Sequence, residues 1–337
     1  MVNYIAAPLR NNSYILYLYV YYFINPVHSM SILLAAPNRD MKPYRDALLK
    51  TDPNLEVEIW PDVRDKKRVQ FAVAWNQPEN IFGQYPNLKV ISSLGAGVDH
   101  LLSDHSIPGN IELTRVVVPS LAGQMSDYVL TAALSILRNT HQYHKQQLTG
   151  NWKRLPAEKK DHFTVGVMGL GAIGKQVAAD LAKSGFRVNG WAKTSKNISG
   201  VETFAKNEFS GFLKRSRIVV CLLPLTSETK DILNLDLFKQ LKSPAHVINA
   251  GRGEHLVDED LLYALDTGLL ESAVLDVFKT EPLPDSHPFW GRKNIVITPH
   301  IASETNPGEV AGLLVENYKR LLSGIDLMHR VNSEKGY

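Results

Sequence analysis

The chain has 337 residues, of which 44% are hydrophobic and 21% are charged, and its 37 basic and 34 acidic residues leave a net charge of +3. This balance, without a dense run of Lys or Arg, argues against a nucleic-acid-binding protein, and at roughly 100–200 residues per domain the length predicts two domains. The only cysteine, Cys221, excludes an intramolecular disulfide and a zinc site made of thiolates, and it fits a cytoplasmic location.

An apolar and aromatic run, YILYLYVYYFI, occupies residues 14–24. It is too short to span a membrane, which needs about 18 apolar residues or more. It also lacks the flanks of an export signal, because only Arg10 precedes it as a positive charge and no small-residue cleavage site follows. We therefore predict that residues 1–29 form an extension outside the fold. Peripheral attachment to a membrane through residues 14–24 stays open as an alternative.

Strand-like and helix-like segments alternate from Met30 onwards, and this alternation predicts βαβ units with a parallel sheet. Apolar periodicity predicts a long helix over residues 122–138, and the polar, basic composition of residues 139–161 predicts a surface connection. Before the long helix, the pattern predicts a helix at residues 44–50 and strands at residues 31–36, 56–60, 69–74 and 88–92.

A second α/β pattern begins at residue 163. Six strands with intervening helices are expected, which is typical of a doubly wound dinucleotide-binding domain. An amphipathic helix is expected near the end of the chain, at residues 310–322. The six strands are expected at residues 164–168, 187–191, 218–223, 246–249, 272–277 and 295–298.

A glycine-rich segment follows the first of these strands and opens a helix that is expected to end at Ser184. In such a unit the first glycine permits a tight turn, the second lets a pyrophosphate approach, and the third allows close packing of helix on strand. The phosphates would lie at the helix N-terminus, where unpaired N–H groups favour anions. The alternative is an ordinary glycine-rich turn. The predicted cofactor contacts are Gly169, Gly171, Ala172, Ile173 and Gly174.

The segment after the second strand favours NADP(H) as the cofactor, with NAD(H) as the second candidate. An NAD enzyme usually places an acidic residue about 20 positions after the glycines, to bond the ribose 2′-hydroxyl. No acidic residue lies between Asp180 and Glu202. Two lysines and two hydroxyls occur there instead, and they suit a 2′-phosphate, although a solvated basic loop is the alternative. These residues are Lys193, Thr194, Ser195 and Lys196.

Three further motifs sit at predicted strand ends, and each contributes a candidate catalytic residue: Arg252, Glu281 and His300. Ligands of open α/β sheets bind at the carboxyl ends of strands, so one site can collect all three. Reduction of a 2-oxo acid needs a cation for the carboxylate, which arginine provides, and a proton donor, which histidine provides near neutral pH. A neighbouring carboxylate favours the imidazolium form and orients the ring. His287 is the rival proton donor.

These motifs resemble those of the D-2-hydroxyacid dehydrogenase family, and within it the bacterial glyoxylate/hydroxypyruvate reductases of the A type. The resemblance covers about residues 30–337, including the closing Val331 to Tyr337, whereas residues 1–29 have no counterpart. The matching pieces are GLGAIG at 169–174, LLPLT at 222–226, NAGRG at 249–253, LDVFKTEPLP at 275–284 and TPHIA at 298–302.

The resemblance implies a role for each residue of the site. It implies that Arg252 binds the substrate, that His300 is the general acid/base and that Glu281 pairs with it. It also implies substrate contacts from the pocket-wall residue Trp75 and from the backbone amides of Gly95, Ala96 and Gly97. The implied cofactor contacts, besides the glycines and the basic loop, are Leu223, Pro224, Ala250, Gly251, Arg252, Asp276 and His300.

The resemblance further implies an α/β fold of two Rossmann-like or flavodoxin-like domains, with doubly wound parallel sheets and the cleft between them. The substrate-binding domain would be discontinuous, comprising residues 30–118 and 303–337, and residues 119–302 would form the dinucleotide-binding domain. A homodimer is implied as well. One stretch departs from the family pattern, because residues 115–121 (RVVVPSL) are more apolar than expected near the nicotinamide.

The sequence therefore predicts a cytoplasmic, NADPH-dependent reductase that converts glyoxylate to glycolate and hydroxypyruvate to D-glycerate without a metal ion. Neither nucleic-acid binding nor stable membrane association is expected. Two alternatives stay open at this point. One is a reductase of a bulkier 2-oxo acid, which a substrate-size profile would reveal. The other is a nucleotide-sensing protein of the same fold, which would bind the cofactor without useful turnover.

Overall fold

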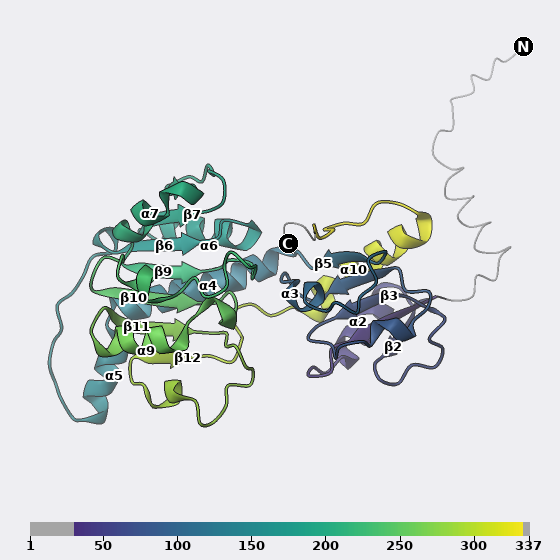
Figure 1. Ribbon diagram of the computed structural model, residues 1–337, viewed down its shortest axis with the longest axis horizontal. Helices are drawn as coiled ribbons and strands as arrows, with labels where there is room; N and C mark the ends of the chain where they lie inside the picture. The colour runs from purple at the N-terminus through teal and green to yellow at the C-terminus, as the bar shows by residue number, and fades with distance from the viewer. Residues whose placement is uncertain (1–29, 333–337) are drawn as a thin grey trace, which may run out of the picture. The chain divides into compact units, whose positions relative to one another are not determined.

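The computed structural model describes residues 30–332, and the predictions for residues 1–29 and 333–337 lie outside the described residues. The described chain divides into two compact units (Figure 1). The assignment of residues 95–103 to the second unit places the predicted substrate loop in the same unit as Arg252. The first unit comprises residues 30–94, Asp104–Thr114 and Ala311–Arg330, and the second comprises Gly95–Ser103, Arg115–Val310 and residues 331–332.

The first unit is built on a parallel sheet. Among the described residues, this sheet has five strands in the order β2-β1-β3-β4-β5, which is the flavodoxin-like order. Its inner strands β1 and β3 are almost wholly buried, as expected for the apolar runs of a sheet that is covered on both faces. The elements are β1 (Ser31–Ala35), α2 (Lys42–Thr51), β2 (Glu56–Ile59), β3 (Val69–Ala74), η1 (Phe82–Gln84), β4 (Val90–Ser93), β5 (Glu112–Arg115) and α10 (Pro307–Ser323), the last of which begins in the second unit.

The second unit contains a parallel sheet of seven strands among the described residues, in the order β12-β11-β10-β9-β6-β7-β8. The order reverses between β6 and β9, and open α/β sheets bind ligands at such a switch point. The strands are β6 (Thr164–Met168), β7 (Arg187–Trp191), β8 (Val201–Phe204), β9 (Ile218–Cys221), β10 (Ala245–Asn249), β11 (Leu270–Leu275) and β12 (Ile295–Ile297). The helices are α3 (Asp99–Leu102), α4 (Pro119–Leu137), α5 (Thr140–Leu148), η2 (Lys160–His162), α6 (Ala172–Lys183), η3 (Lys206–Glu208), α7 (Phe209–Arg215), α8 (Leu235–Phe238), η4 (Gly253–His255), α9 (Asp258–Asp266) and η5 (Pro288–Gly291).

Helices cover both faces of the second sheet, and each face has its own apolar core. Alternate residues of β9 show this division. Ile218 and Val220 belong to the cluster that includes α4 and α6, whereas Val219 and Cys221 belong to the cluster that includes α7, α8 and α9. Because the central strands β6, β9 and β10 are buried on both sides, their carboxyl ends are where the chain can present polar side chains to a ligand.

The predicted α/β fold with parallel sheets is confirmed, and three strands, β3, β6 and β7, have the bounds that the sequence predicted. Several elements differ from the predictions. The first sheet has a fifth strand, β5, that the sequence did not indicate, because it is short and only Thr114 among its four residues is buried. The second sheet has a seventh strand, β8, which is short and partly exposed and so lacks an apolar signal. The segment at residues 139–161 is more than a surface connection, because it contains α5; none of the side chains of α5 is buried, so no apolar stripe marked it as a helix.

None of the helices within residues 30–332 is long and apolar enough to cross a membrane. In the same range, no group of three or more His, Cys, Asp and Glu side chains is arranged to hold a metal ion.

Candidate active site

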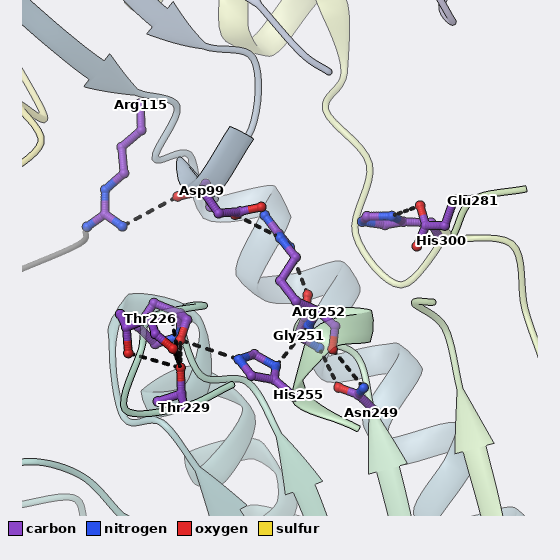
Figure 2. Close-up of polar contacts among 12 residues, drawn as sticks. Asp99, Arg115, Thr226, Thr229, Asn249, Gly251, Arg252, His255, Glu281 and His300 are labelled. Carbon is purple, nitrogen blue, oxygen red and sulfur yellow. Dashed lines mark hydrogen bonds and ion pairs between the residues drawn. The ribbon is translucent and has the colours of Figure 1, made fainter. Parts of the chain in front are cut away.

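The three predicted catalytic residues lie on loops that follow neighbouring strands of the second sheet. Arg252 comes three positions after the end of β10, and Glu281 follows β11 after a longer interval. His300 comes three positions after the end of β12. Since β10, β11 and β12 are adjacent and parallel, their carboxyl ends share one edge of the sheet, and the three side chains come from that edge (Figure 2).

His300 and Glu281 form a hydrogen-bonded pair. The distance between His300 Nδ1 and Glu281 Oε2 is 2.8 Å, and each side chain is about 30% exposed. The other oxygen, Glu281 Oε1, accepts a hydrogen bond of 3.0 Å from the backbone N–H of Phe278. Burial tends to raise the pKa of Glu281, but the hydrogen bonds from His300 and Phe278 and the charges of His300 and Arg252 outweigh it and lower this pKa. Glu281 is therefore a carboxylate at neutral pH.

Asp276 fixes the loop that carries His300. Its carboxylate is buried and accepts hydrogen bonds from Thr298 Oγ1 at 2.6 Å and from the backbone N–H groups of Ile301 and Ala302 at 2.9 and 2.8 Å. The loop needs this support because His300 has a φ of +55°, in the left-handed region that non-glycine residues enter at a cost of about 1–2 kcal/mol. Asp276 thus positions the predicted proton donor, and its predicted contact with the cofactor stays a prediction.

Arg252 is held by hydrogen bonds at both its side chain and its backbone. Its Nε donates to Asp99 Oδ1 at 2.8 Å, and its Nη1 donates to the carbonyl of Gly251 at 2.8 Å. Its backbone carbonyl accepts from Asn249 Nδ2 at 2.9 Å. Burial tends to raise the pKa of Asp99, but the charges of Arg252 and His100 lower it overall, so the two side chains form an ion pair. The hydrogen bonds to Asp99 and Gly251 hold the guanidinium in a single orientation.

The predicted substrate loop packs directly on the guanidinium of Arg252. A Cβ atom at Gly97 would lie only 1.6 Å from Arg252 Nη2, so no other residue fits at this position without moving the arginine. The carbonyl of Ala96 accepts a hydrogen bond of 3.4 Å from Arg115 Nη1, which turns the carbonyl toward that arginine. The structure therefore brings the loop of Gly95, Ala96 and Gly97 beside Arg252, as the two halves of a carboxylate-binding site require.

The glycine-rich segment after β6 leaves open space at the start of α6 and close contacts elsewhere. Gly169 has a φ of +97°, and a Cβ there would lie 2.7 Å from the carbonyl of Leu222. A Cβ at Gly174 would lie 1.8 Å from the carbonyl of Gly169, so the third glycine lets the helix approach the strand. A Cβ at Gly171 would meet no atom within 4 Å. Gly171 precedes α6, so the open space lies at the N-terminus of that helix, where an anion is favoured.

The predicted 2′-phosphate loop, residues 193–196, is exposed and follows β7. Two neighbours that the sequence did not indicate join it. Glu228 lies 3.7 Å from Lys193 Nζ and 2.9 Å from Lys206 Nζ. The hydrogen bond from Lys206, with the charges of both lysines, lowers the pKa of Glu228. A third lysine and one carboxylate therefore belong to this basic surface, and only the fold brings them there.

The remaining candidates take other places. Trp75 lies directly after β3 in the first unit, where the guanidinium carbon of Arg39 sits 5.1 Å from the centre of its ring. Its predicted contact with substrate stays a prediction. The rival acid His287 contacts Asp258 at 3.4 Å rather than Glu281. Its Nδ1 accepts a hydrogen bond from the backbone N–H of Phe289, so His287 caps the N-terminus of η5.

Comparison with known proteins decides the family. The family described as "D-isomer specific 2-hydroxyacid dehydrogenase, NAD binding domain" matches residues 130–302. The chain belongs to this family. It is accordingly an NAD(P)-dependent 2-hydroxyacid dehydrogenase, and the resemblance drawn from its motifs is confirmed.

Several members of the family are similar along most of the chain. The glyoxylate/hydroxypyruvate reductase A of Yersinia enterocolitica is 35% identical over 314 residues, which cover 91% of this chain and 100% of the relative. The reductase A of Photorhabdus laumondii is 37% identical and covers 88% of this chain and 96% of the relative.

Solved structures agree with the sequence relatives. A 2-hydroxyacid dehydrogenase from Xanthobacter autotrophicus in complex with NADPH and MES has a TM-score of 0.87 and 34% identity, covering 92% of this chain and 100% of that chain. An NADPH-dependent glyoxylate/hydroxypyruvate reductase from Sinorhizobium meliloti, in complex with NADP and sulfate, has a TM-score of 0.87 and 34% identity and covers 91% of this chain and 100% of that chain.

The lowered pKa of Glu281 makes a prediction about stability. A carboxyl group whose pKa is lower in the folded than in the unfolded chain stabilises the fold at pH values above its ordinary pKa of 4.5, and this contribution is lost as the pH falls through the folded value. We expect Glu281→Gln to lower the Tm by about 2–4 °C at neutral pH and by less below pH 4.5. Thermal melts at both pH values check this. The exposed Glu259→Gln on α9 is the control, and an equal Tm difference at both pH values would contradict the account.

Proposed function

We propose that this enzyme reduces small 2-oxo acids with NADPH, converting glyoxylate to glycolate and hydroxypyruvate to D-glycerate. One observation carries the proposal: an arginine held against a glycine-rich loop lies in the same unit as a hydrogen-bonded histidine–carboxylate pair, with all three proposed catalytic side chains at neighbouring strand ends (Figure 2). The A-type reductases that are similar along the chain support the choice of substrate class.

Arg252 and the loop of residues 95–97 would bind the carboxylate of the 2-oxo acid. The planar guanidinium offers paired donors that match the two oxygens of a carboxylate. Asp99 supports this by holding Nε, so that Arg252 need not lose side-chain freedom when the substrate binds. The same positive charge, close to the carbonyl beside the carboxylate, favours negative charge on the carbonyl oxygen as reduction proceeds.

His300 would provide the proton. Its Nδ1 is engaged by Glu281, so Nε2 is the nitrogen that would donate a proton to the oxygen of the new hydroxyl group. Glu281 stabilises the charged ring before the transfer, and Asp276 keeps the His300 loop in place through its three hydrogen bonds. A bound nicotinamide cofactor supplies the hydride in this chemistry.

Analysis of the products tests the proposed reaction. With hydroxypyruvate and NADPH, we expect D-glycerate, and with glyoxylate we expect glycolate, each formed in step with the NADPH consumed. A reductase of bulkier 2-oxo acids would instead turn over phenylpyruvate faster than glyoxylate. A nucleotide-sensing protein would bind NADPH and form no product. Either of these results would contradict the proposal.

NADP(H) is the cofactor that we propose for this chain, with the phosphates at Gly169 to Gly174 and the 2′-phosphate at residues 193–196. Complexes of similar proteins with NADPH and NADP support this choice. Leu223, Pro224, Ala250 and Gly251 complete the proposed set of cofactor contacts, together with Arg252, Asp276 and His300. The open space at Gly171 and the lysines after β7 fit a dinucleotide that carries an extra phosphate.

Replacing the basic loop should change the choice of cofactor. We expect Lys193→Asp combined with Lys196→Ala to lower the ratio of kcat/KM for NADPH to kcat/KM for NADH by about 30-fold or more, because two charged contacts with the 2′-phosphate are lost and each costs about 1 kcal/mol or more. Lys183→Ala, at the opposite end of α6, is the matched control and should leave the ratio unchanged. An unchanged ratio in the double variant would disprove the role of this loop.

We also propose that the enzyme is a cytoplasmic homodimer and that α5 with the residues after it forms the contact between subunits. Trp152 is 98% exposed and Leu148 is 70% exposed, the highest values among the large apolar side chains of the described residues, and a subunit contact would cover this apolar surface. We expect Trp152→Ser to raise the Kd of the dimer by about 10–100-fold, as the loss of an interface tryptophan does. Sedimentation equilibrium measures this. Ile325→Ser, at an exposed apolar residue of the first unit, is the control. A native protein that is monomeric at all concentrations would contradict this assembly.

A further inference from the structure

His255 is a buried polar side chain that the proposed reaction does not use. It ends η4, three positions after Arg252, and its exposed fraction is 0%. A buried imidazole needs partners for its ring nitrogens. Nδ1 lies 3.1 Å from the backbone nitrogen of Arg252 and 3.5 Å from Sγ of Cys221. Because a backbone N–H can only donate, Nδ1 is the acceptor, and the ring carries its proton on Nε2.

The opposite nitrogen of His255 faces the turn that follows β9. Nε2 lies 3.4 Å from the carbonyl oxygen of Pro224. This oxygen also accepts a hydrogen bond of 2.7 Å from Thr229 Oγ1, and Thr229 Oγ1 accepts one of 2.8 Å from the backbone N–H of Thr226. The ring of His255 therefore lies between the turn that holds Arg252 and the turn that holds Pro224, a proposed cofactor contact (Figure 2).

The backbone around the ring leaves little room for Arg252 to shift. A Cβ at Gly251 would lie 3.0 Å from His255 Nδ1 and 3.2 Å from the carbonyl of Cys221, so the chain at Gly251 runs between the ring and β9. Asn249 holds the carbonyl of Arg252 while His255 holds its N–H. Burial lowers the pKa of His255 to about 4, so the ring is neutral at neutral pH and Nδ1 can accept.

We propose that His255 is a positioning residue for substrate binding, which fixes the backbone of Arg252 against the turn at Pro224 and so sets the arginine relative to the cofactor site. This inference rests on the proposed function of Arg252 as the carboxylate-binding residue. The effect of His255 on the reaction would be geometric, because a displacement of a binding group by about 1 Å can lower a rate by about 100-fold.

Two variants separate the two ring nitrogens. The amide oxygen of His255→Asn can accept the N–H of Arg252 in place of Nδ1, whereas the longer side chain of His255→Gln places its amide near Nε2 and provides no acceptor close to Arg252. We expect His255→Gln to lower kcat/KM for glyoxylate by about 10–100-fold, mainly through a higher KM, with the Kd of NADPH changed by less than about threefold. We expect His255→Asn to keep most of the activity.

A matched control is another buried histidine on the same part of the sheet. His246 lies near the start of β10, at the end of the strand opposite to Arg252, and its Nδ1 is 2.8 Å from Ser272 Oγ. We expect His246→Gln to lower the Tm without raising the KM for glyoxylate. In an Arg252→Ala background, His255→Gln should change kcat/KM by less than about twofold, because His255 acts through Arg252.

Binding of oxalate separates this inference from the proposed reaction. Oxalate has carboxylates but no ketone to reduce, so calorimetry with the NADPH-bound protein measures the carboxylate site without turnover. We expect its Kd to rise in His255→Gln and to stay near the native value in His255→Asn. Absence of glyoxylate turnover by the native protein would contradict the proposed function alone. Equal oxalate affinity in native protein, His255→Gln and His255→Asn, or a full additive loss in the Arg252→Ala background, would overturn the positioning role.

Discussion

His300→Asn should lower kcat for glyoxylate by about 10²–10⁴-fold, which is the range that a positioned general acid contributes. Asparagine is the appropriate replacement because His300 has a φ of +55°, and asparagine enters the left-handed region more readily than alanine does. The loop that Asp276 holds should therefore keep its shape, and the Kd of NADPH should change by less than about threefold. Single-turnover kinetics and NADPH fluorescence titration measure the two quantities.

His287→Asn is the control for this loss, since His287 pairs with Asp258 and not with Glu281. It should retain at least about half of the native kcat. If His287→Asn lost its activity and His300→Asn kept it, the assignment of the proton donor would be wrong. If both variants lost NADPH binding, the loss of activity would report on the fold rather than on proton transfer.

Arg252→Lys should lower kcat/KM for glyoxylate by about 10²–10³-fold although the positive charge remains. Lysine carries its three donors on one nitrogen, so it cannot replace the separate nitrogens that bond Asp99 and Gly251 and still present paired donors to a carboxylate. Arg252→Ala should be more severe and should also lower the Tm, because it leaves the largely buried carboxylate of Asp99 without its partner. Steady-state kinetics should show the Lys variant mainly as a higher KM.

Arg217→Lys is the matched control for Arg252→Lys. Arg217 is also largely buried and pairs with Glu158, but it precedes β9 and so lies at the amino end of the sheet. We expect it to lower the Tm with little effect on KM. A similar KM in the native enzyme and Arg252→Lys would show that the substrate carboxylate is bound elsewhere.

The parts of the site that the sequence predicted are those with local signals. The glycines at 169–174 and the three motifs at 249–253, 275–284 and 298–302 each lie at the end of an apolar strand. Each contains residue types that bind a cofactor or substrate. Parallel strands then bring the motifs to one edge without further information. For this reason the pairing of His300 with Glu281 followed from the order of the elements, whereas the approach of the loop at Gly97 to Arg252 was implied only by the resemblance to the family.

The supporting residues could not be predicted in the same way, because tertiary packing brings them in. Asp99 reaches Arg252 from 153 positions earlier in the chain, and in the sequence it is only an acidic residue after a glycine-rich segment. His255 and Glu228 have no strand or motif of their own. The role of His255 appears only when the turns after β9 and β10 are side by side, and that of Glu228 only when the turn after β9 meets the lysines that follow β7 and β8. Spacing identifies groups that act on a ligand, whereas groups that hold other side chains depend on the assembled core.

The measurement that tests the central claim most directly is the rate of NADPH oxidation by the native protein with glyoxylate, hydroxypyruvate, pyruvate and phenylpyruvate, each compared with NADH. We predict rapid oxidation of NADPH with the two small substrates glyoxylate and hydroxypyruvate, slower oxidation with the other two, and a lower kcat/KM with NADH throughout. No oxidation of NADPH with any of the four substrates, in protein that binds NADPH, would contradict the account.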